Sequence, residues 1–231
     1  MKLYSGPLSL FTAKVRVALD EKRLPYERVE VGWSLAQRYL PHHPDVAALN
    51  PKGQVPVLVD GALAVYDSTL IFEYLEDRYP EPPLYPADVA GRARCRQLEA
   101  AADELIFPPL WDLIDGAFYP AAGERDDGRL GRARAFLARE HARLDGELGA
   151  GAYLCGSFSV ADIASFIMVH TAASLGAPPA EEHAALHAWL ERMRGRPAVR
   201  REIDAMSRFV AGLLAPPAAR DAGAPAAAAA S

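Results

Sequence analysis

The sequence predicts two consecutive domains, an α/β domain with a mixed four-stranded sheet and then an all-helical domain. Strand-like and helical patterns alternate up to a proline-rich segment at 81–88, and only helical periods follow it. A chain of 231 residues is long enough for two such domains with a sizeable core. We therefore expect domains at 1–80 and 89–214, joined by a linker at 81–88.

Composition and charge narrow the class of protein. The chain is 51% hydrophobic and 24% charged, as soluble globular proteins are, and its net charge of −5 argues against a general nucleic-acid binder. We see neither a leader segment nor an apolar run of membrane-spanning length, so we expect a cytoplasmic protein without a membrane partner. Cys95 and Cys155 form no recognisable metal or disulfide pattern, and no metal is expected. Cys95 shares a helical face with Leu98, Ala102 and Leu105, so we expect a buried thiol.

The first elements form a crossover unit. Residues 2–5 and 26–31 read as strands, and 11–22 as a helix with apolar residues at 11, 15, 18 and 19. The charged residues of that helix, from Lys14 to Lys22, fall mostly on its other face. A strand–helix–strand unit is right-handed and its strands are parallel. One short helix is expected within 34–49.

Residues 53–68 organise the first domain. Two short apolar strands flank Asp60-Gly61, a dipeptide suited to a tight hairpin turn. Pro56 opens the first of these strands, where a missing N–H does no harm. Asp67 and Ser68 precede an apolar helical run and predict a helix N-terminus. Such an end is either a plain N-cap or a site for a carboxylate, because its free N–H groups and dipole favour an anion.

The second domain shows helical periods at 89–114, 129–148, 160–175 and 183–194. Ser159 and Asp162 fit a capping box with Asp in place of the usual Glu, and Phe158 and Ile163 are placed for a hydrophobic staple. Residues 215–231 are mostly Ala and Pro, so we expect a disordered tail there.

Four motifs together resemble the cytosolic glutathione transferases, over residues 1 to about 210. They lie at 9–16, 50–58, 67–75 and 153–163, and their order and spacing around the proline-rich linker make the resemblance specific. It is closest to the serine-type theta, zeta and omega-like classes. The resemblance implies a thioredoxin-like N-terminal domain, a helical-bundle C-terminal domain and, usually, a homodimer. Its partners would be glutathione, as co-substrate, and a hydrophobic electrophile.

The resemblance also implies the glutathione-binding residues. Pro56 matches a proline that is cis in the family, and the backbone of Val55 would pair with the cysteinyl part of glutathione as an added strand. Asp67 and Ser68 match the residues that hold the γ-glutamyl end, although the family often has Glu or Gln in place of Asp67. Gln54 also reaches the tripeptide. His43 either faces the glycyl carboxylate or is a loop histidine without a ligand.

Ser9 matches the catalytic position of the serine-type classes. A free thiol has a pKa near 8.5, and a hydroxyl donor at a helix N-terminus lowers it by favouring the thiolate. Tyr4, Ser5 and Thr12 are competing candidates, with Tyr4 expected to pack inside its strand. Because Ser rather than Cys stands at position 9, mixed-disulfide chemistry is disfavoured.

The electrophile pocket is expected between the domains. Its candidate lining residues are Leu8, Leu10, Phe107, Trp111 and Tyr119, although an aromatic stripe of this kind is also compatible with plain core packing. Leu10 replaces a proline that often follows the catalytic position. The expected activity is conjugation of glutathione to a hydrophobic electrophile, and isomerase, dehalogenase and peroxidase reactions would need the same thiolate. The alternative is a non-catalytic protein of this fold that binds a ligand or a partner.

Overall fold

A four-stranded sheet forms the base of the N-terminal domain in the computed structural model, which describes residues 1–119 and 126–214. The expected disordered tail at 215–231 lies outside the described residues. The elements follow the predicted order: β1 (Lys2–Ser5), α1 (Leu10–Glu21), β2 (Glu27–Glu30), α2 (Pro44–Leu49), β3 (Val57–Asp60), β4 (Leu63–Tyr66) and α3 (Ser68–Arg78). The strands lie in the order β2-β1-β3-β4, with β1 and β2 parallel and the other neighbours antiparallel.

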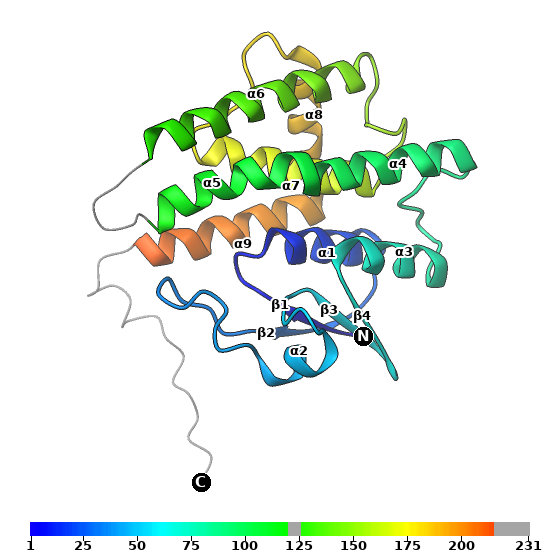
Figure 1. Cartoon of the computed structure of the whole chain (residues 1–231). Helices are drawn as coiled ribbons and strands as arrows, with labels where there is room; N and C mark the ends of the chain where they lie inside the picture. The colour runs from blue at the N-terminus through cyan, green and yellow to red at the C-terminus, as the bar shows by residue number, and fades with distance from the viewer. Residues whose placement is uncertain (120–125, 215–231) are drawn as a thin grey trace.

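The two faces of the sheet are covered by different helices. Leu3 and Leu58 are fully buried in the main core, on the face covered by α1 and α3. Tyr4 and Val57 pack on the other face, with Val46 of α2. Figure 1 shows this order of layers, with α2 below the sheet and α1 and α3 between the sheet and the helical domain. Successive side chains of a strand point to opposite faces of the sheet, so each strand contributes to the packing on both faces.

The hairpin turns one residue later than expected. Asp60 pairs with Leu63 within the strands, so the two loop residues are Gly61 and Ala62, and Gly61 takes the positive φ of 61°. The carboxylate of Asp60 instead accepts hydrogen bonds from the hydroxyls of Tyr74 (2.8 Å) and Tyr79 (2.7 Å). Asp60 therefore fixes the hairpin against α3.

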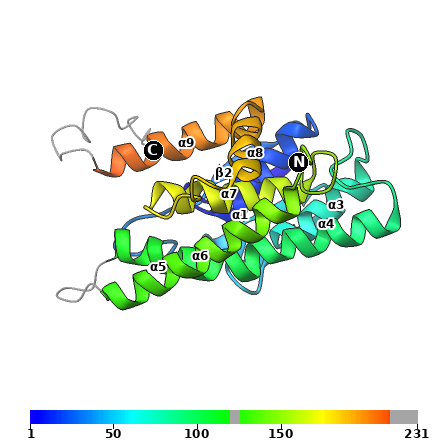
Figure 2. The same ribbon diagram turned by 90° about the horizontal axis from the view of Figure 1, so that it is seen from above.

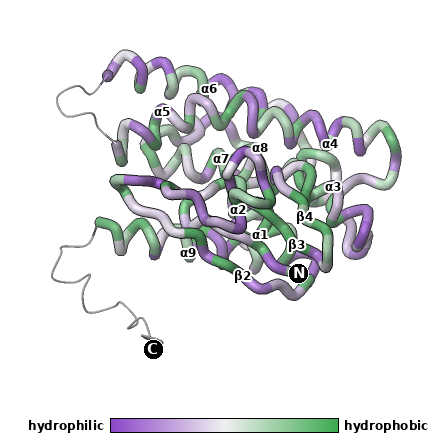
Figure 3. The backbone as a smooth tube through the Cα atoms, turned by 60° about the horizontal axis from the view of Figure 1, so that its bottom comes forward, coloured by the Kyte–Doolittle hydropathy of each residue, from purple (hydrophilic) through white to green (hydrophobic). Residues whose placement is uncertain are grey.

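The C-terminal domain is helical throughout its described part. It contains α4 (Val89–Ala101), the π-helical segment η1 (Ala102–Ile106), α5 (Phe107–Phe118), α6 (Asp127–Leu148), α7 (Val160–Ser174), α8 (Ala184–Arg194) and α9 (Pro197–Leu214). Seen from above, α4, α5 and α6 run along one side of the domain, α9 lies on the other, and α7 lies between them (Figure 2). Hydrophilic and hydrophobic residues alternate along α6, as in a helix with one solvated face (Figure 3).

Buried Asp162 anchors the start of α7. The expected capping box is present, and in it the Asp162 carboxylate accepts a hydrogen bond from the backbone N–H of Ser159 at 3.0 Å. The Ser159 hydroxyl also donates to this carboxylate at 3.0 Å. The same carboxylate accepts from Leu154 N–H at 3.0 Å and from Trp189 Nε1 at 2.8 Å. Asp162 thus joins the chain before α7 to the buried indole of α8.

The single helix expected over 89–114 is interrupted. The interruption is η1, which lies directly before Pro108 and Pro109 in α5. These prolines offer no N–H to the carbonyls four residues earlier, so the helix is widened where those carbonyls lie. One consequence is that Leu105, expected on the buried face with Cys95, is 40% exposed, while Cys95 itself is fully buried.

Two further expectations need correction. The helix α9 was not expected as an element, although Val199, Ile203, Met206 and Val210 recur at helical spacing. The charged residues of the helix expected over 11–22 were placed on the face opposite its apolar residues, whereas Lys14, Arg16 and Lys22 are buried. The reason is that other helices pack over that face and supply a carboxylate for each cation: Glu99, Glu202 and Glu76, respectively.

Candidate functional site

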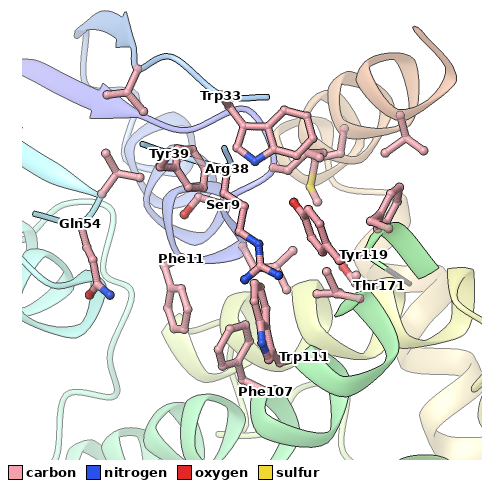
Figure 4. Close-up of a pocket in the computed structure, with 18 of the residues that line it drawn as sticks. Ser9, Phe11, Trp33, Arg38, Tyr39, Gln54, Phe107, Trp111, Tyr119 and Thr171 are labelled. Carbon is pink, nitrogen blue, oxygen red and sulfur yellow. The ribbon is translucent and has the colours of Figure 1, made fainter. Parts of the chain in front are cut away.

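A cavity of about 950 Å³ lies between the two domains. Its walls come from the start of α1, the loop between β2 and α2, the loop before β3, and helices α5, α7 and α9. All five residues expected in the electrophile pocket line it, together with Ser9: Leu8, Ser9, Leu10, Phe107, Trp111 and Tyr119. The rings of Phe11, Phe107 and Trp111 form one aromatic wall (Figure 4). Phe107 lies 4.7 Å from Phe11 and 6.0 Å from Trp111, measured between ring centroids.

Ser9 caps the N-terminus of α1 at the edge of this cavity. Its Oγ accepts a hydrogen bond from the backbone N–H of Thr12 at 3.2 Å. A hydroxyl has one proton to donate besides its lone pairs, so this cap leaves the Ser9 O–H free to donate. An anion placed beside Ser9 would also lie at the positive end of the α1 dipole.

The three competitors of Ser9 lie elsewhere. The Tyr4 hydroxyl donates to Asp45 at 2.7 Å, and this hydrogen bond, with burial, raises the pKa of Tyr4 to about 12. Ser5 is fully buried and its hydroxyl accepts from Arg16. Thr12 is also fully buried, and none of the three is among the residues that line the cavity.

The loop before β3 borders the same cavity. Gln54 and Val55 line it, and the Val55–Pro56 peptide bond is cis, as expected. Buried Asn50 holds the loop in place, because its Nδ2 donates to the Gln54 carbonyl at 2.7 Å and its Oδ1 accepts from Lys52 N–H at 2.9 Å. This role of Asn50 was not anticipated.

Gly53 permits the tight path of this loop. Its φ is +64°, and a Cβ at this position would lie 3.0 Å from the ring of His42, which also lines the cavity. Next to it, His43 caps α2 through Nδ1, which accepts from Asp45 N–H at 3.2 Å, and it faces the cavity as well.

Asp67 and Ser68 stand apart from the residues above. They form the N-terminus of α3 as expected, with the Asp67 carboxylate accepting from Thr69 N–H at 3.2 Å. Neither residue lines the cavity. The ammonium of Lys52 lies 3.3 Å from the Asp67 carboxylate. Ser68 itself is 2% exposed.

A buried polar cluster lies behind the start of α3. Lys14 donates to Glu99 at 2.9 Å and to Asp103 at 2.7 Å, while the Thr69 hydroxyl donates to Glu99 at 2.9 Å. Burial raises the pKa of Asp103 to about 6, although Lys14 opposes this shift. One ammonium thus faces two carboxylates at the contact between α1, α3 and the helical domain.

Several cavity residues were missed. Arg38, Trp33, Thr171 and the α9 residues line the cavity, but no function was assigned to them from the sequence. The helical spacing within α9 could have indicated its apolar face. Among the described residues, no group of three or more His, Cys, Asp or Glu side chains could hold a metal ion. No described helix is long and apolar enough to span a bilayer.

Taken together, a sheet domain with a cis-proline loop, a capped serine and an interdomain apolar cavity define a protein of the thioredoxin-like class with an added helical domain. Residues 3–83 match the family model for the glutathione S-transferase N-terminal domain, and residues 116–197 match the model for the C-terminal domain. A glutathione S-transferase structure from Rhodospirillum rubrum is 32% identical, with a TM-score of 0.75, covering 87% of this chain and 90% of that one. The chain therefore belongs to the glutathione S-transferase family.

Other relatives have names that describe different kinds of protein. A stringent starvation protein A homolog of Coxiella burnetii is 33% identical over 66% of this chain and 66% of its own length. Glutathione S-transferase Z2 of Arabidopsis thaliana is 43% identical over 40% of each chain, so the match spans less than two thirds of both relatives. A glutathione transferase of Burkholderia graminis, crystallised with two glutathione molecules per subunit, is 28% identical with a TM-score of 0.76, covering 88% of this chain and 87% of that one.

Proposed function

We propose that this protein is a glutathione transferase in which Ser9 stabilises the thiolate of glutathione for attack on a hydrophobic electrophile. The observation that carries the proposal is the position of Ser9. It caps α1, and it borders the same cavity as Val55 and the aromatic wall of Phe107 and Trp111. The solved relative that holds glutathione supports this choice of co-substrate.

The chemistry required of Ser9 is modest. Lowering a thiol pKa by about two units requires only about 2.7 kcal/mol of differential stabilisation. One or two charge-assisted hydrogen bonds supply that amount, and the Ser9 O–H remains available as a donor. Bringing the thiolate and the electrophile together in one cavity then supplies the proximity that speeds the reaction. The same thiolate could serve an isomerisation.

Glutathione would extend from Ser9 along the loop before β3. We propose that the Val55 backbone pairs with its cysteinyl part, that Gln54 contacts the peptide, and that His43 faces its glycyl carboxylate. Its γ-glutamyl end would reach the N-terminus of α3, where Ser68 N–H meets the carboxylate. The ammonium would share Asp67 with Lys52, which already lies 3.3 Å from it. A cytoplasmic homodimer is the assembly that we propose, as implied by the family.

The decisive experiment compares three variants. Ser9→Ala removes the donor, Ser9→Thr retains a hydroxyl, and Ser157→Ala removes an exposed serine that does not line the cavity. We expect kcat/KM for chlorodinitrobenzene to fall by about tenfold or more in Ser9→Ala, with partial recovery in Ser9→Thr and no change in Ser157→Ala. An ultraviolet titration of bound glutathione should show a higher thiol pKa in Ser9→Ala only.

Ser9→Ala also removes a helix cap, which costs about 1 kcal/mol of stability. Rates are therefore measured well below the unfolding temperature of each variant, and glutathione affinity is measured by calorimetry. If Ser9→Ala retains full activity and the same thiol pKa, the role of Ser9 is wrong.

A second function has specific support. The Coxiella relative is named as a stringent starvation protein A homolog rather than as an enzyme, and Lys52 already forms an ion pair with Asp67. Both observations favour a non-catalytic protein that binds a ligand or a partner. That function predicts either no calorimetric signal with glutathione, or binding without any lowering of the thiol pKa.

A further inference from the structure

One arginine projects into a mostly apolar cavity. Arg38 lies in the loop between β2 and α2, and its φ is +56°, an uncommon conformation for a residue with a side chain. The loop is closed by two backbone hydrogen bonds, from Ser34 N–H to Arg38 O at 2.9 Å and from Arg38 N–H to Ser34 O at 2.7 Å. A residue held at positive φ by its surroundings is often one whose side chain has a function.

The side chain of Arg38 reaches across to the helical domain. Its Nη2 donates to the Asp115 carboxylate at 2.9 Å. Its Cζ lies 4.0 Å from the ring centroid of Tyr119 and 5.1 Å from that of Trp111. Figure 4 shows the guanidinium in the middle of the cavity, above Trp111 and beside Tyr119. A guanidinium has five N–H donors, and Asp115 engages one nitrogen only.

The carboxylate of Asp115 is shared between Arg38 and a second arginine. Its Oδ1 accepts from Arg38, whereas its Oδ2 accepts from Arg129 at 2.9 Å, so this carboxylate contacts two guanidinium groups. Arg129 also donates to Asp112 at 3.4 Å. Among the described residues that line the cavity there is no Asp or Glu, and Arg38 is the one Arg or Lys. A ligand in the cavity therefore meets mostly apolar walls, a few polar side chains such as Gln37 and Gln54, and one arginine whose counter-ion is shared.

We propose that Arg38 makes this cavity selective for flat aromatic ligands that carry an acidic substituent, such as a carboxylate or sulfonate. The ring of the ligand packs against Phe107 and Trp111, and its anionic group accepts hydrogen bonds from Arg38. Asp115 holds the guanidinium in position for this contact. The identification of this ligand with the electrophile rests on the proposed function. The preference of the cavity for an anionic ligand does not.

A pair of fluorescent dyes tests the preference directly. Anilinonaphthalene sulfonate and phenylnaphthylamine share the same aromatic skeleton, and only the first is anionic. We expect Arg38→Met to raise the Kd of the sulfonate about tenfold, the effect of losing one charge-assisted hydrogen bond, and to leave the neutral dye within about twofold. Arg38→Lys should lie between Arg38→Met and the unaltered protein. Arg92→Met, which removes an α4 arginine that lies over the ring of Tyr85, should change neither dye.

The proposal is overturned if the unaltered protein binds both dyes equally, or if Arg38→Met weakens both dyes to the same extent. A kinetic arm then compares chlorodinitrobenzoate with chlorodinitrobenzene, and Arg38→Met should lower the ratio of their kcat/KM values about tenfold. If the dyes discriminate but neither nitrobenzene reacts with glutathione, the proposed transferase function fails while the ligand preference stands.

Discussion

The ammonium of Lys14 lies 2.9 Å from the carboxylate of Glu99, and the two side chains are 0% and 1% exposed. Because α1 carries Ser9 at its start and Glu99 belongs to α4, this ion pair joins the helix of the proposed catalytic residue to the helical domain. It also lies one hydrogen bond from Thr69, the second residue of α3. The pair therefore connects the elements on which the proposed glutathione site is built.

Removing the cation from this cluster should be costly. Lys14→Met leaves the Glu99 and Asp103 carboxylates buried without their counter-ion, so we expect a loss of about 3–5 kcal/mol in the free energy of unfolding, measured in urea. Arg96→Met breaks the pair with Glu73, in which the arginine side chain is 48% exposed, and should cost less than about 1 kcal/mol. Equal losses in the two variants would contradict this account.

Acid should destabilise the protein through His141. This side chain of α6 is 1% exposed, neither ring nitrogen has a hydrogen-bond partner among the described residues, and burial lowers its pKa to about 4. Between that value and about 6.5 the unfolded chain binds the extra proton and the native protein does not, so stability rises with pH. This pKa difference contributes about 3 kcal/mol to the free energy of unfolding, and the contribution is lost as the pH falls through this window.

The measurement is the free energy of unfolding between pH 4 and 7, values that bracket the window set by the burial of His141. His141→Leu should flatten the dependence, whereas His187→Leu, which removes an exposed histidine of α8, should leave the slope unchanged. An unaltered slope in His141→Leu would assign the acid sensitivity to other groups.

Ala substitutions at two glycines of the same backbone conformation distinguish the cost of backbone strain from the cost of a steric clash. Gly61 has a φ of +61° and open space where a Cβ would lie, whereas Gly53 has a φ of +64° and the ring of His42 at 3.0 Å from that position. Gly61→Ala should therefore cost about 1–2 kcal/mol of stability and leave glutathione binding unchanged. Gly53→Ala should cost more and also weaken glutathione binding, because the loop that carries Gln54 and Val55 must shift. Calorimetry with glutathione distinguishes these outcomes.

Much of the fold could be predicted from short-range patterns in the sequence. The caps at Asp67 and Ser159 and the strands on either side of Gly61 follow from short-range chemistry, in which a side chain or a turn satisfies nearby backbone groups. The position of Ser9 at a helix start, and the five apolar residues around the cavity, could likewise be predicted once the family resemblance was recognised.

Long-range packing decided what could not be predicted. The burial of Lys14 depends on carboxylates 85 and 89 residues away, and no pattern around Lys14 indicates them. Arg38 likewise meets Asp115 across 77 residues. The helix α9 differs from these cases, because the apolar spacing from Val199 to Val210 was present in the sequence and could have been read.

The buried cations of α1 and of its C-cap, Lys22, have a consequence for how the protein unfolds. Lys22 pairs with Glu76 of α3, Lys14 with Glu99 of α4, and Arg16 with Glu202 of α9. A helix that belongs to the sheet domain by chain order is thus bonded through its charges to both halves of the protein. If one half unfolded alone, a charged side chain of the other half would lose its ion-pair partner. We therefore expect the two halves to unfold together in one cooperative transition.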